Sequence, residues 1–83
     1  MGLDTVELLV DIENEFEISI SNLEAEKIIT VEDYYKIITS KLNSNKFDVR
    51  ILKRLKNIIN RRTGIDSNQI RLESRICQDL GLD

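Results

Sequence analysis

The chain has 83 residues, of which 41% are hydrophobic, and this length allows one small domain with a modest core. One cysteine and no histidine leave no disulfide within the chain, no cysteine-based cluster and no zinc site or triad that needs histidine. Its apolar runs are no longer than four residues, whereas a membrane span needs roughly 18 or more, so we expect a soluble cytoplasmic protein without a membrane segment.

The net charge of −3 conceals an uneven distribution along the chain. Residues 1–40 contain ten acids and two bases, whereas residues 41–83 contain ten bases and five acids. Such asymmetry indicates two partners, a nucleic-acid-binding end, or oppositely charged helices that pack side by side. The bases from Arg50 to Arg62 interleave with apolar positions of one helix and include no aromatic residue for base stacking. We therefore favour helix packing and expect no nucleic-acid partner.

Helical periodicity dominates the chain, and proline is absent. The first segment has apolar residues at helical spacing, which predicts a core face made of Thr5, Leu8, Leu9, Ile12 and Phe16. A second apolar stripe on the same helix is flanked by Glu7, Glu13, Asn14 and Glu17 and consists of Leu3, Val6 and Val10. The pattern alone leaves open whether this second stripe packs on another helix or stays exposed. If exposed, it suits a partner with a hydrophobic groove edged by Arg and Lys.

Two capping boxes mark the starts of the next helices. In "SNLE" the hydroxyl of Ser21 can accept from the amide of Glu24 while the glutamate reaches back, which predicts a short helix to about residue 28. In "TVED" Thr30 and Asp33 repeat the device. This second box predicts a third helix, and its apolar face is Val31, Tyr34, Tyr35, Ile38 and Leu42.

The polar run "LNSNK" interrupts the helical pattern, and Asp48 is the predicted N-cap of the clearest amphipathic helix. Gly64 is predicted to stop this helix, whose apolar residues are Ile51, Leu52, Leu55, Ile58 and Ile59. Residues 65–83 carry scattered apolar residues and predict a long loop pinned to the core. Within this loop, Cys77 is predicted to be a small buried apolar residue rather than a reactive thiol. These elements together predict an all-α, small four-helix bundle.

A loop of this length is uncommon in so small a domain. The run "LKNIINRRTGIDSNQIRLESRICQDLGLD" resembles the first helix and long loop of an acyl carrier protein. The run "LDTVELLVDIENEFEISISNLEAEKIITVEDYYKII" resembles that family's second, third and fourth helices. Because the two halves stand in reverse order, the chain resembles a circularly permuted acyl carrier protein. Residues 1–42 then correspond to family helices II to IV, residues 43–47 join the old termini, and residues 48–83 correspond to helix I and the long loop.

The bridge between the old termini is short but sufficient. From Lys41 to Asp48 there are seven steps in the sequence, which at roughly 3.3 Å each span at most about 23 Å, enough to cross one end of a small bundle. Two alternatives to a permuted single domain stay open. The chain can be a piece running from the middle of one carrier domain to the middle of the next, or two chains can supply each other's missing half. We therefore expect a monomer or a domain-swapped dimer.

The resemblance also assigns a functional residue. In acyl carrier proteins an Asp-Ser-Leu motif at the start of the second helix carries 4′-phosphopantetheine on the serine hydroxyl, and the cofactor thiol holds the acyl chain. Here Asp83 matches the aspartate, Leu3 matches the leucine, and the serine position falls on Gly2. Glycine has no side-chain oxygen, and neither Ser74 nor Ser21 is a convincing substitute, so we expect no cofactor on this chain. The permutant is natural or engineered, since Met-Gly is also a frequent product of cloning at a start codon.

The resemblance implies a role in fatty-acid or polyketide biosynthesis and a surface that recognises carrier synthases, ketosynthases and acyltransferases. That surface consists of Asp83, Leu3, Asp4, Val6, Glu7, Val10 and Glu13, while Asn14 stands where the family commonly has an acid. Candidates for lining an acyl-chain slit, each equally suited to a core, are Leu9, Ile12, Ile28, Ile37 and Ile58. The alternative function is a non-covalent interaction module that binds a basic partner through the acidic helix. No set of acid, base and nucleophile is visible, so we expect neither an enzyme nor a metal site.

Overall fold

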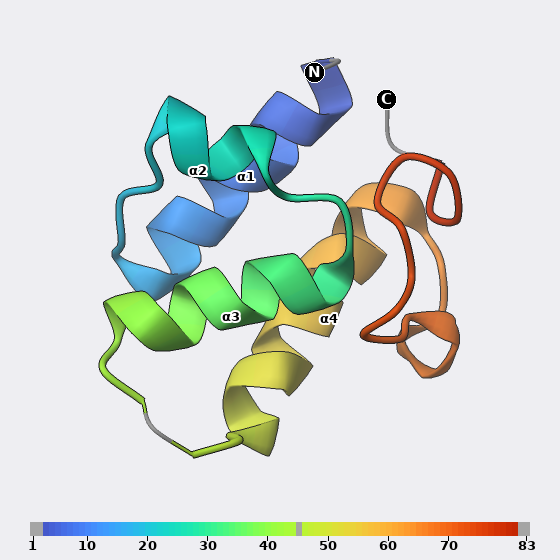
Figure 1. Cartoon of the computed structure of the whole chain (residues 1–83). Helices are drawn as coiled ribbons and strands as arrows, with labels where there is room; N and C mark the ends of the chain where they lie inside the picture. The colour runs from blue at the N-terminus through green and yellow to red at the C-terminus, as the bar shows by residue number, and fades with distance from the viewer. Residues whose placement is uncertain (1–2, 45, 82–83) are drawn as a thin grey trace.

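The structure is a computed structural model that describes residues 3–44 and 46–81. These residues form α1 (Leu3–Phe16), α2 (Asn22–Glu26), α3 (Val31–Lys41), α4 (Val49–Thr63) and the short 3₁₀ helix η1 (Ser67–Gln69) (Figure 1). The described part of the chain contains no β-strand. Thr30 and Arg75 form an isolated antiparallel β-bridge. The predicted all-α fold, a small bundle of four helices, is confirmed.

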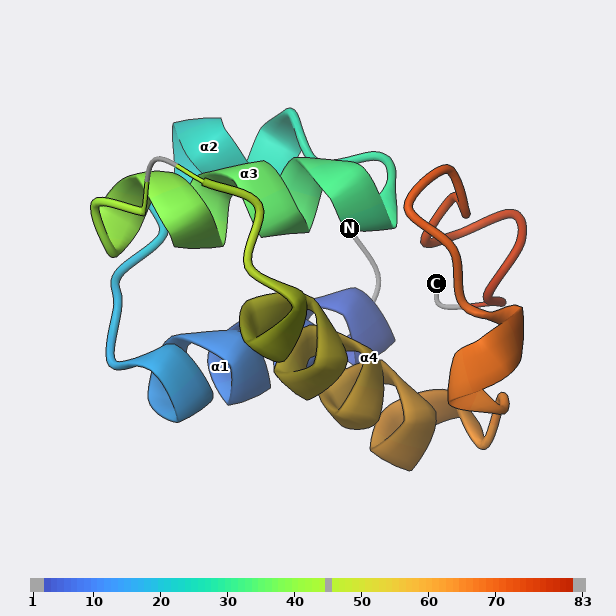
Figure 2. The same cartoon turned by 90° about the horizontal axis from the view of Figure 1, so that it is seen from below.

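The helices lie in two layers. Figure 2 shows α2 and α3 in one layer above α1 and α4. Helix α4 packs against α1, α3 and η1. It therefore contacts both layers and the C-terminal loop. The radius of gyration is 11.6 Å, close to the value of about 12 Å expected for a compact domain of this length. Within residues 3–44 and 46–81, each helix is too short or too polar to cross a lipid bilayer.

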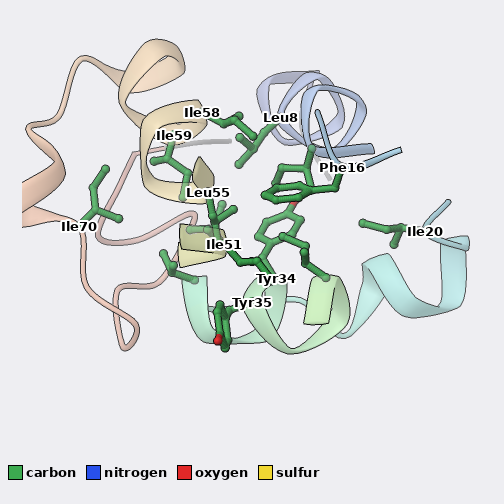
Figure 3. Close-up of a cluster of buried hydrophobic side chains, with 14 of the residues drawn as sticks. Leu8, Phe16, Ile20, Tyr34, Tyr35, Ile51, Leu55, Ile58, Ile59 and Ile70 are labelled. Carbon is green, nitrogen blue, oxygen red and sulfur yellow. The ribbon is translucent and has the colours of Figure 1, made fainter. Parts of the chain in front are cut away.

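One hydrophobic core fills the space between the layers. Its fully buried side chains are Leu8, Ile12, Val31, Ile38, Leu55, Ile58, Ile59 and Ile70. Figure 3 shows side chains from α1, α3, α4 and the loop around Ile70 directed into this one interior. Tyr34 also lies in the core, and burial raises the pKa of its hydroxyl, which therefore stays neutral at ordinary pH.

The predicted apolar faces are largely confirmed. On α1, Thr5 and Phe16 are buried together with the two core residues of that helix, whereas Leu9 is partly buried. On α3 the prediction for Leu42 is wrong, because this residue is 40% exposed. The helix ends at Lys41, and Leu42 is its C-cap, followed by Asn43 with a left-handed φ of 56°. The chain therefore turns away from the core before Leu42 can join it.

The helix ends follow the predicted capping residues. Ser21 and Thr30 both form complete capping boxes, and the Asp48 side chain accepts a hydrogen bond from the amide of Arg50. Helix α4 ends before Gly64, whose φ of 77° is readily adopted by glycine. Helix α2 ends at Glu26, about a half turn before the predicted end. These caps depend on neighbouring residues only, which is why the sequence pattern predicts them well.

The long segment after α4 is held by buried anchors. Ile70, Ile76 and Leu80 are at most 5% exposed. The anchors are separated by turns, and the only regular element among residues 65–81 is η1. The prediction of a long loop pinned to the core is confirmed, with a short 3₁₀ turn that the sequence did not predict.

The loop also completes the N-terminus of α3. The first amides of a helix have no partner inside the helix. Here the amides of Val31 and Glu32 donate to the backbone carbonyls of Ser74 and Leu72, over 3.0 and 2.9 Å. Two segments that are far apart in sequence therefore share the hydrogen bonds of one helix start.

Asp33 supplies the rest of this cap. Its Oδ2 accepts hydrogen bonds from the amides of Ile29 and Thr30, at 2.8 and 3.0 Å. Partial burial by itself raises the pKa of the Asp33 carboxyl, but these amides and the Thr30 hydroxyl outweigh that effect and hold the pKa below its usual value of 3.8. The ionised carboxylate is therefore the form that stabilises the start of α3.

The prediction that Cys77 is buried is wrong, because its side chain is exposed. The amides of Asp79 and Leu80 both donate to the carbonyl of Arg75, at 2.9 and 3.1 Å, and close a tight turn. In this turn Ile76 and Leu80 take the inward positions, with 3% and 5% exposure. Cys77 lies between them on the solvent side. Its side chain is therefore exposed although that of the preceding residue, Ile76, is buried.

Candidate functional site

The predicted attachment position and its aspartate neighbour, Gly2 and Asp83, lie outside the described residues. Helix α1 begins at Leu3, and Asp4 lies in its first turn. In Figures 1 and 2 the start of α1 and the end of the described C-terminal loop lie at the same end of the molecule. The fold thus brings the two ends of the described chain to one end of the bundle.

Val6 and Val10 form an exposed apolar strip on α1. Their residues are 42% and 45% exposed, whereas Leu8 and Ile12 on the same helix are 0% exposed. The two valines are one helical turn apart and therefore lie on the same face. The sequence left open whether this stripe packs on another helix, and the structure shows that both valines face solvent.

Glu7 and Asp11, also one turn apart on α1, are held by one arginine of α4. Arg62 Nη1 donates to Glu7 Oε2 at 2.7 Å, and Arg62 Nε donates to Asp11 Oδ2 at 2.5 Å. The Arg62 side chain is 35% exposed, so the pairs lie at the surface but not fully in solvent. The sequence placed Glu7 in the partner-binding surface but did not predict Arg62, because only helix packing brings this residue to α1.

A second arginine joins the other end of α1 to α4. Arg54 Nε and Nη2 donate to Glu15 Oε2 at 3.1 and 2.8 Å, and Nη2 also donates to the Glu15 carbonyl at 2.9 Å. The Arg54 guanidinium lies 4.6 Å from the centre of the Phe16 ring, within cation–π range. The prediction that the acidic and basic halves pack against each other as helices is confirmed.

Glu13, another residue of the predicted surface, contacts the end of its own helix. Its Oε2 accepts a hydrogen bond from the amide of Ile20 at 2.8 Å, and its carbonyl accepts from the amide of Ile18 at 3.1 Å. Glu17, the first residue after α1, has a left-handed φ of 54°. Glu13 therefore fixes the turn that leads from α1 to α2, a role that the pattern of charges did not indicate.

A shallow depression of about 500 Å³ lies between α1 and α4, and its lining is mostly charged: Asp11, Asn14, Glu15, Arg61 and Arg62. An acyl chain needs an apolar lining, so this depression is unsuited to one. Among residues 3–44 and 46–81 no group of three or more Cys, Asp and Glu side chains is arranged to hold a metal ion. The exposed large apolar side chains of α1 in the described residues are those of the valine strip, which lies beside the Arg62 ion pairs.

Comparison with curated proteins finds similarity over about half of the chain. The acyl carrier protein of Chlorobium phaeobacteroides is 49% identical over 40 residues, which are 48% of this chain and 51% of that protein. The acyl carrier protein of Cyanidium caldarium is 48% identical over 43 residues, which are 52% of this chain and 50% of that protein. About half of this chain is therefore similar to acyl carrier proteins. The chain thus spans about half the length of the curated relatives it matches, and no family model and no solved structure matches it.

The serines considered as substitutes for the attachment residue of acyl carrier proteins both have structural roles. Ser74 is 8% exposed, and its Oγ accepts from the amide of Arg71 at 3.0 Å. Ser21 Oγ accepts from the amide of Glu24 at 3.1 Å as the cap of α2. Ser74 is therefore largely out of reach of a modifying enzyme, and the Ser21 oxygen acts as a helix cap.

The residues that the resemblance to acyl carrier proteins assigns to a slit contribute to the core of this structure. Ile12 and Ile58 are 0% and 1% exposed. Leu9, Ile28 and Ile37 are partly buried and pack against the core. Their sequence pattern fits a core as well as a slit, and the structure places two of them in the core and three against it.

Proposed function

We propose that this chain is a carrier-type domain of fatty-acid or polyketide biosynthesis, a scaffold for delivery rather than an enzyme. The observation that carries the proposal is the similarity to two acyl carrier proteins at nearly half identity. The four-helix fold and the exposed strip of Val6 and Val10 on an acidic helix agree with that role. Carrier synthases, ketosynthases and acyltransferases are the proposed partners, and α1 with its valine strip is the proposed contact.

We further propose that the connectivity is circularly permuted, with residues 1–42 equivalent to family helices II to IV and residues 48–83 to helix I and the long loop. A collinear alignment of a permuted chain can follow only one of its halves, and matches of 40 and 43 residues have the length of one half. The packing of α4 against α1 and α3 supports this arrangement, because a first helix must contact the others to complete the bundle. The ends of the described chain also lie at one end of the bundle.

The proposed attachment position is Gly2, flanked by Asp83 and Leu3. Attachment of 4′-phosphopantetheine forms a phosphodiester on a serine oxygen, with coenzyme A as the donor and adenosine 3′,5′-bisphosphate as the leaving product. Glycine offers no oxygen for this bond. We therefore expect the chain with Gly2 to remain unmodified, and the burial of Ser74, which is 8% exposed, supports this expectation.

Substitution at position 2 tests the proposal. The unchanged chain, Gly2→Ser and Gly2→Ala are incubated with coenzyme A and a broad-specificity carrier synthase, and intact masses are measured. We expect Gly2→Ser alone to gain the mass of one phosphopantetheine group. Modification of the unchanged chain or of Gly2→Ala places the attachment site elsewhere, and Ser74→Ala and Ser21→Ala then identify it.

The second candidate function is a non-covalent interaction module, favoured by the valine strip, whose exposure does not depend on a serine at position 2. The same synthase, immobilised, distinguishes the two functions by measuring binding. A chain that binds basic partners while a folded Gly2→Ser variant stays unmodified supports the module. Modification of Gly2→Ser supports the carrier.

A further inference from the structure

We propose that Arg62 is an internal competitor for the acidic rim of α1, and that it lowers the affinity of basic partners for the strip formed by Val6 and Val10. This inference rests on the proposed function, because it takes α1 as the docking helix. It concerns a residue on α4, outside the surface that the resemblance assigned. Arg62 is thus proposed to lower the rate and the strength with which basic partners dock.

The geometry places the competition beside the strip. Glu7 and Asp11 each follow one of the two exposed valines directly in the sequence, and Arg62 spans them with hydrogen bonds of 2.7 and 2.5 Å. The two acid side chains are 43% and 35% exposed, so solvent and an approaching partner can reach them. A partner's Arg or Lys that approaches the valine strip therefore meets two carboxylates that are already paired with Arg62.

These ion pairs are suited to exchange. The side chains of Arg62, Glu7 and Asp11 all remain partly exposed, so a partner's Arg or Lys can reach the carboxylates and replace Arg62. Charges across an interface mainly control the encounter rate and the register of docking. Neutralisation of Glu7 and Asp11 inside the molecule weakens the negative potential near the strip, and binding must first break the pairs with Arg62.

Arg54 provides an internal contrast. It bonds to the backbone carbonyl of Glu15 as well as to its carboxylate, and it covers the ring of Phe16. The contacts of Arg62 with α1 described above are to carboxylate oxygens. Removal of Arg54 therefore costs packing at the end of α1, whereas removal of Arg62 releases the carboxylates of Glu7 and Asp11.

The test measures association with the carrier synthase, immobilised, at low salt. Because an exposed pair is worth only a small free energy, we expect Arg62→Ala to bind about two- to fivefold faster or tighter than the unchanged chain. The matched control is Arg71→Ala, which changes the net charge equally on a side chain 71% exposed in the loop. We expect the control to change binding much less, and the gain from Arg62→Ala to disappear near 1 M salt, where the screening length is about 3 Å.

Two further measurements separate competition from a structural role. Arg62→Lys keeps the charge but lacks the fork that reaches both carboxylates, so we expect binding between that of the unchanged chain and that of Arg62→Ala. In the unchanged chain, the ¹⁵N resonance of Arg62 Nε is expected to shift toward that of a solvent-exposed arginine when the synthase is added. The resonance of Arg54 Nε should stay in place.

The outcomes distinguish this inference from the function on which it rests. Binding by the unchanged chain without any gain for Arg62→Ala, or an equal gain for Arg71→Ala, overturns the role of Arg62 and leaves the docking helix intact. Lack of binding by every folded variant overturns the docking helix and the inference with it. If circular dichroism shows that Arg62→Ala is unfolded, Arg62→Lys and the Nε resonance decide: an unmoved resonance in the bound protein overturns the proposal.

Discussion

The linker, described at residues 43–44 and 46–47, and the loop at residues 65–81 both lie outside the α-helices, yet they depend on the rest of the molecule in different ways. In the linker, the Ser44 hydroxyl donates to the nearby carbonyl of Lys46, and Phe47 is 59% exposed with its ring 5.2 Å from that of Tyr35. The linker amides of Asn43 and Ser44 donate to carbonyls in the last turn of α3, which directly precedes them in the sequence. The loop is longer, buries three aliphatic side chains and accepts hydrogen bonds from the first amides of α3, a segment far from it in the sequence. Burial and hydrogen bonds to distant segments, rather than length, therefore decide how firmly such a segment belongs to the fold.

The largest effect is expected at a loop anchor. Ile70→Ala removes a side chain that is 0% exposed, and large-to-small changes of this kind cost about 2–5 kcal/mol of unfolding free energy. Phe47→Ala in the linker is the matched control, and we expect a loss below about 1 kcal/mol because the ring is mostly in solvent. Chemical denaturation measures both. Equal losses contradict the comparison between the two segments.

A smaller effect is expected where the loop meets α3. Asp33→Ala removes the acceptor for two backbone amides, and we expect a loss of about 1–2 kcal/mol in unfolding free energy. The control is Glu32→Ala, the neighbouring acid in the same helical turn, whose side chain is 51% exposed and pairs with Lys36 at 4.0 Å. A similar loss for both variants indicates a general charge effect at the helix start instead of a cap.

Acid should weaken the same junction. The folded-state pKa of Asp33 is below the usual value of 3.8, so its stabilising contribution is fully present above 3.8 and is lost as the pH falls through the lower folded-state value. We expect the difference in unfolding free energy between the unchanged chain and Asp33→Asn to shrink as the pH falls below 3.8. Urea titrations at several pH values test this, and a difference that stays constant down to the lowest pH removes Asp33 as the cause.

The smallest effect is expected from a longer linker. Insertion of Gly-Ser between Lys46 and Phe47, which lies beyond the hydrogen bonds of Asn43 and Ser44 to α3, should cost less than about 0.6 kcal/mol because loop-closure entropy rises slowly with length. The same insertion between Glu73 and Ser74 displaces the carbonyls that accept from Val31 and Glu32 and should cost more. If both insertions are equally harmless in thermal denaturation, the loop is not fixed by these hydrogen bonds.

Local features of the sequence predicted most of the fold. Ser21, Thr30, Asp48 and Gly64 each stop or start a helix where the pattern placed the boundary. Capping is decided by side chains and amides within a few residues, so a single sequence contains the needed information. Leu42 shows the limit, because its helical spacing fits the core face while its position after the last turn takes it out of the core.

Features that depend on how the helices and the loop pack could not be predicted from the sequence pattern. The exposure of Cys77 follows from the turn that begins at Arg75, and no sequence motif predicted this turn. For the candidate site, periodicity found the stripe of Val6 and Val10 but not its exposure. Arg62 required knowledge that α4 lies beside α1, although two acids one turn apart on α1 already offered a site for a shared cation.

The hydrogen bonds from Val31 and Glu32 to the loop have a consequence for hydrogen exchange. An amide exchanges when its own hydrogen bond opens, and parts of a protein can open separately from global unfolding. These two amides belong to α3 by position, yet their acceptors are carbonyls of Ser74 and Leu72. Their exchange rates therefore report undocking of the C-terminal loop, while amides later in α3 report the opening of the helix itself.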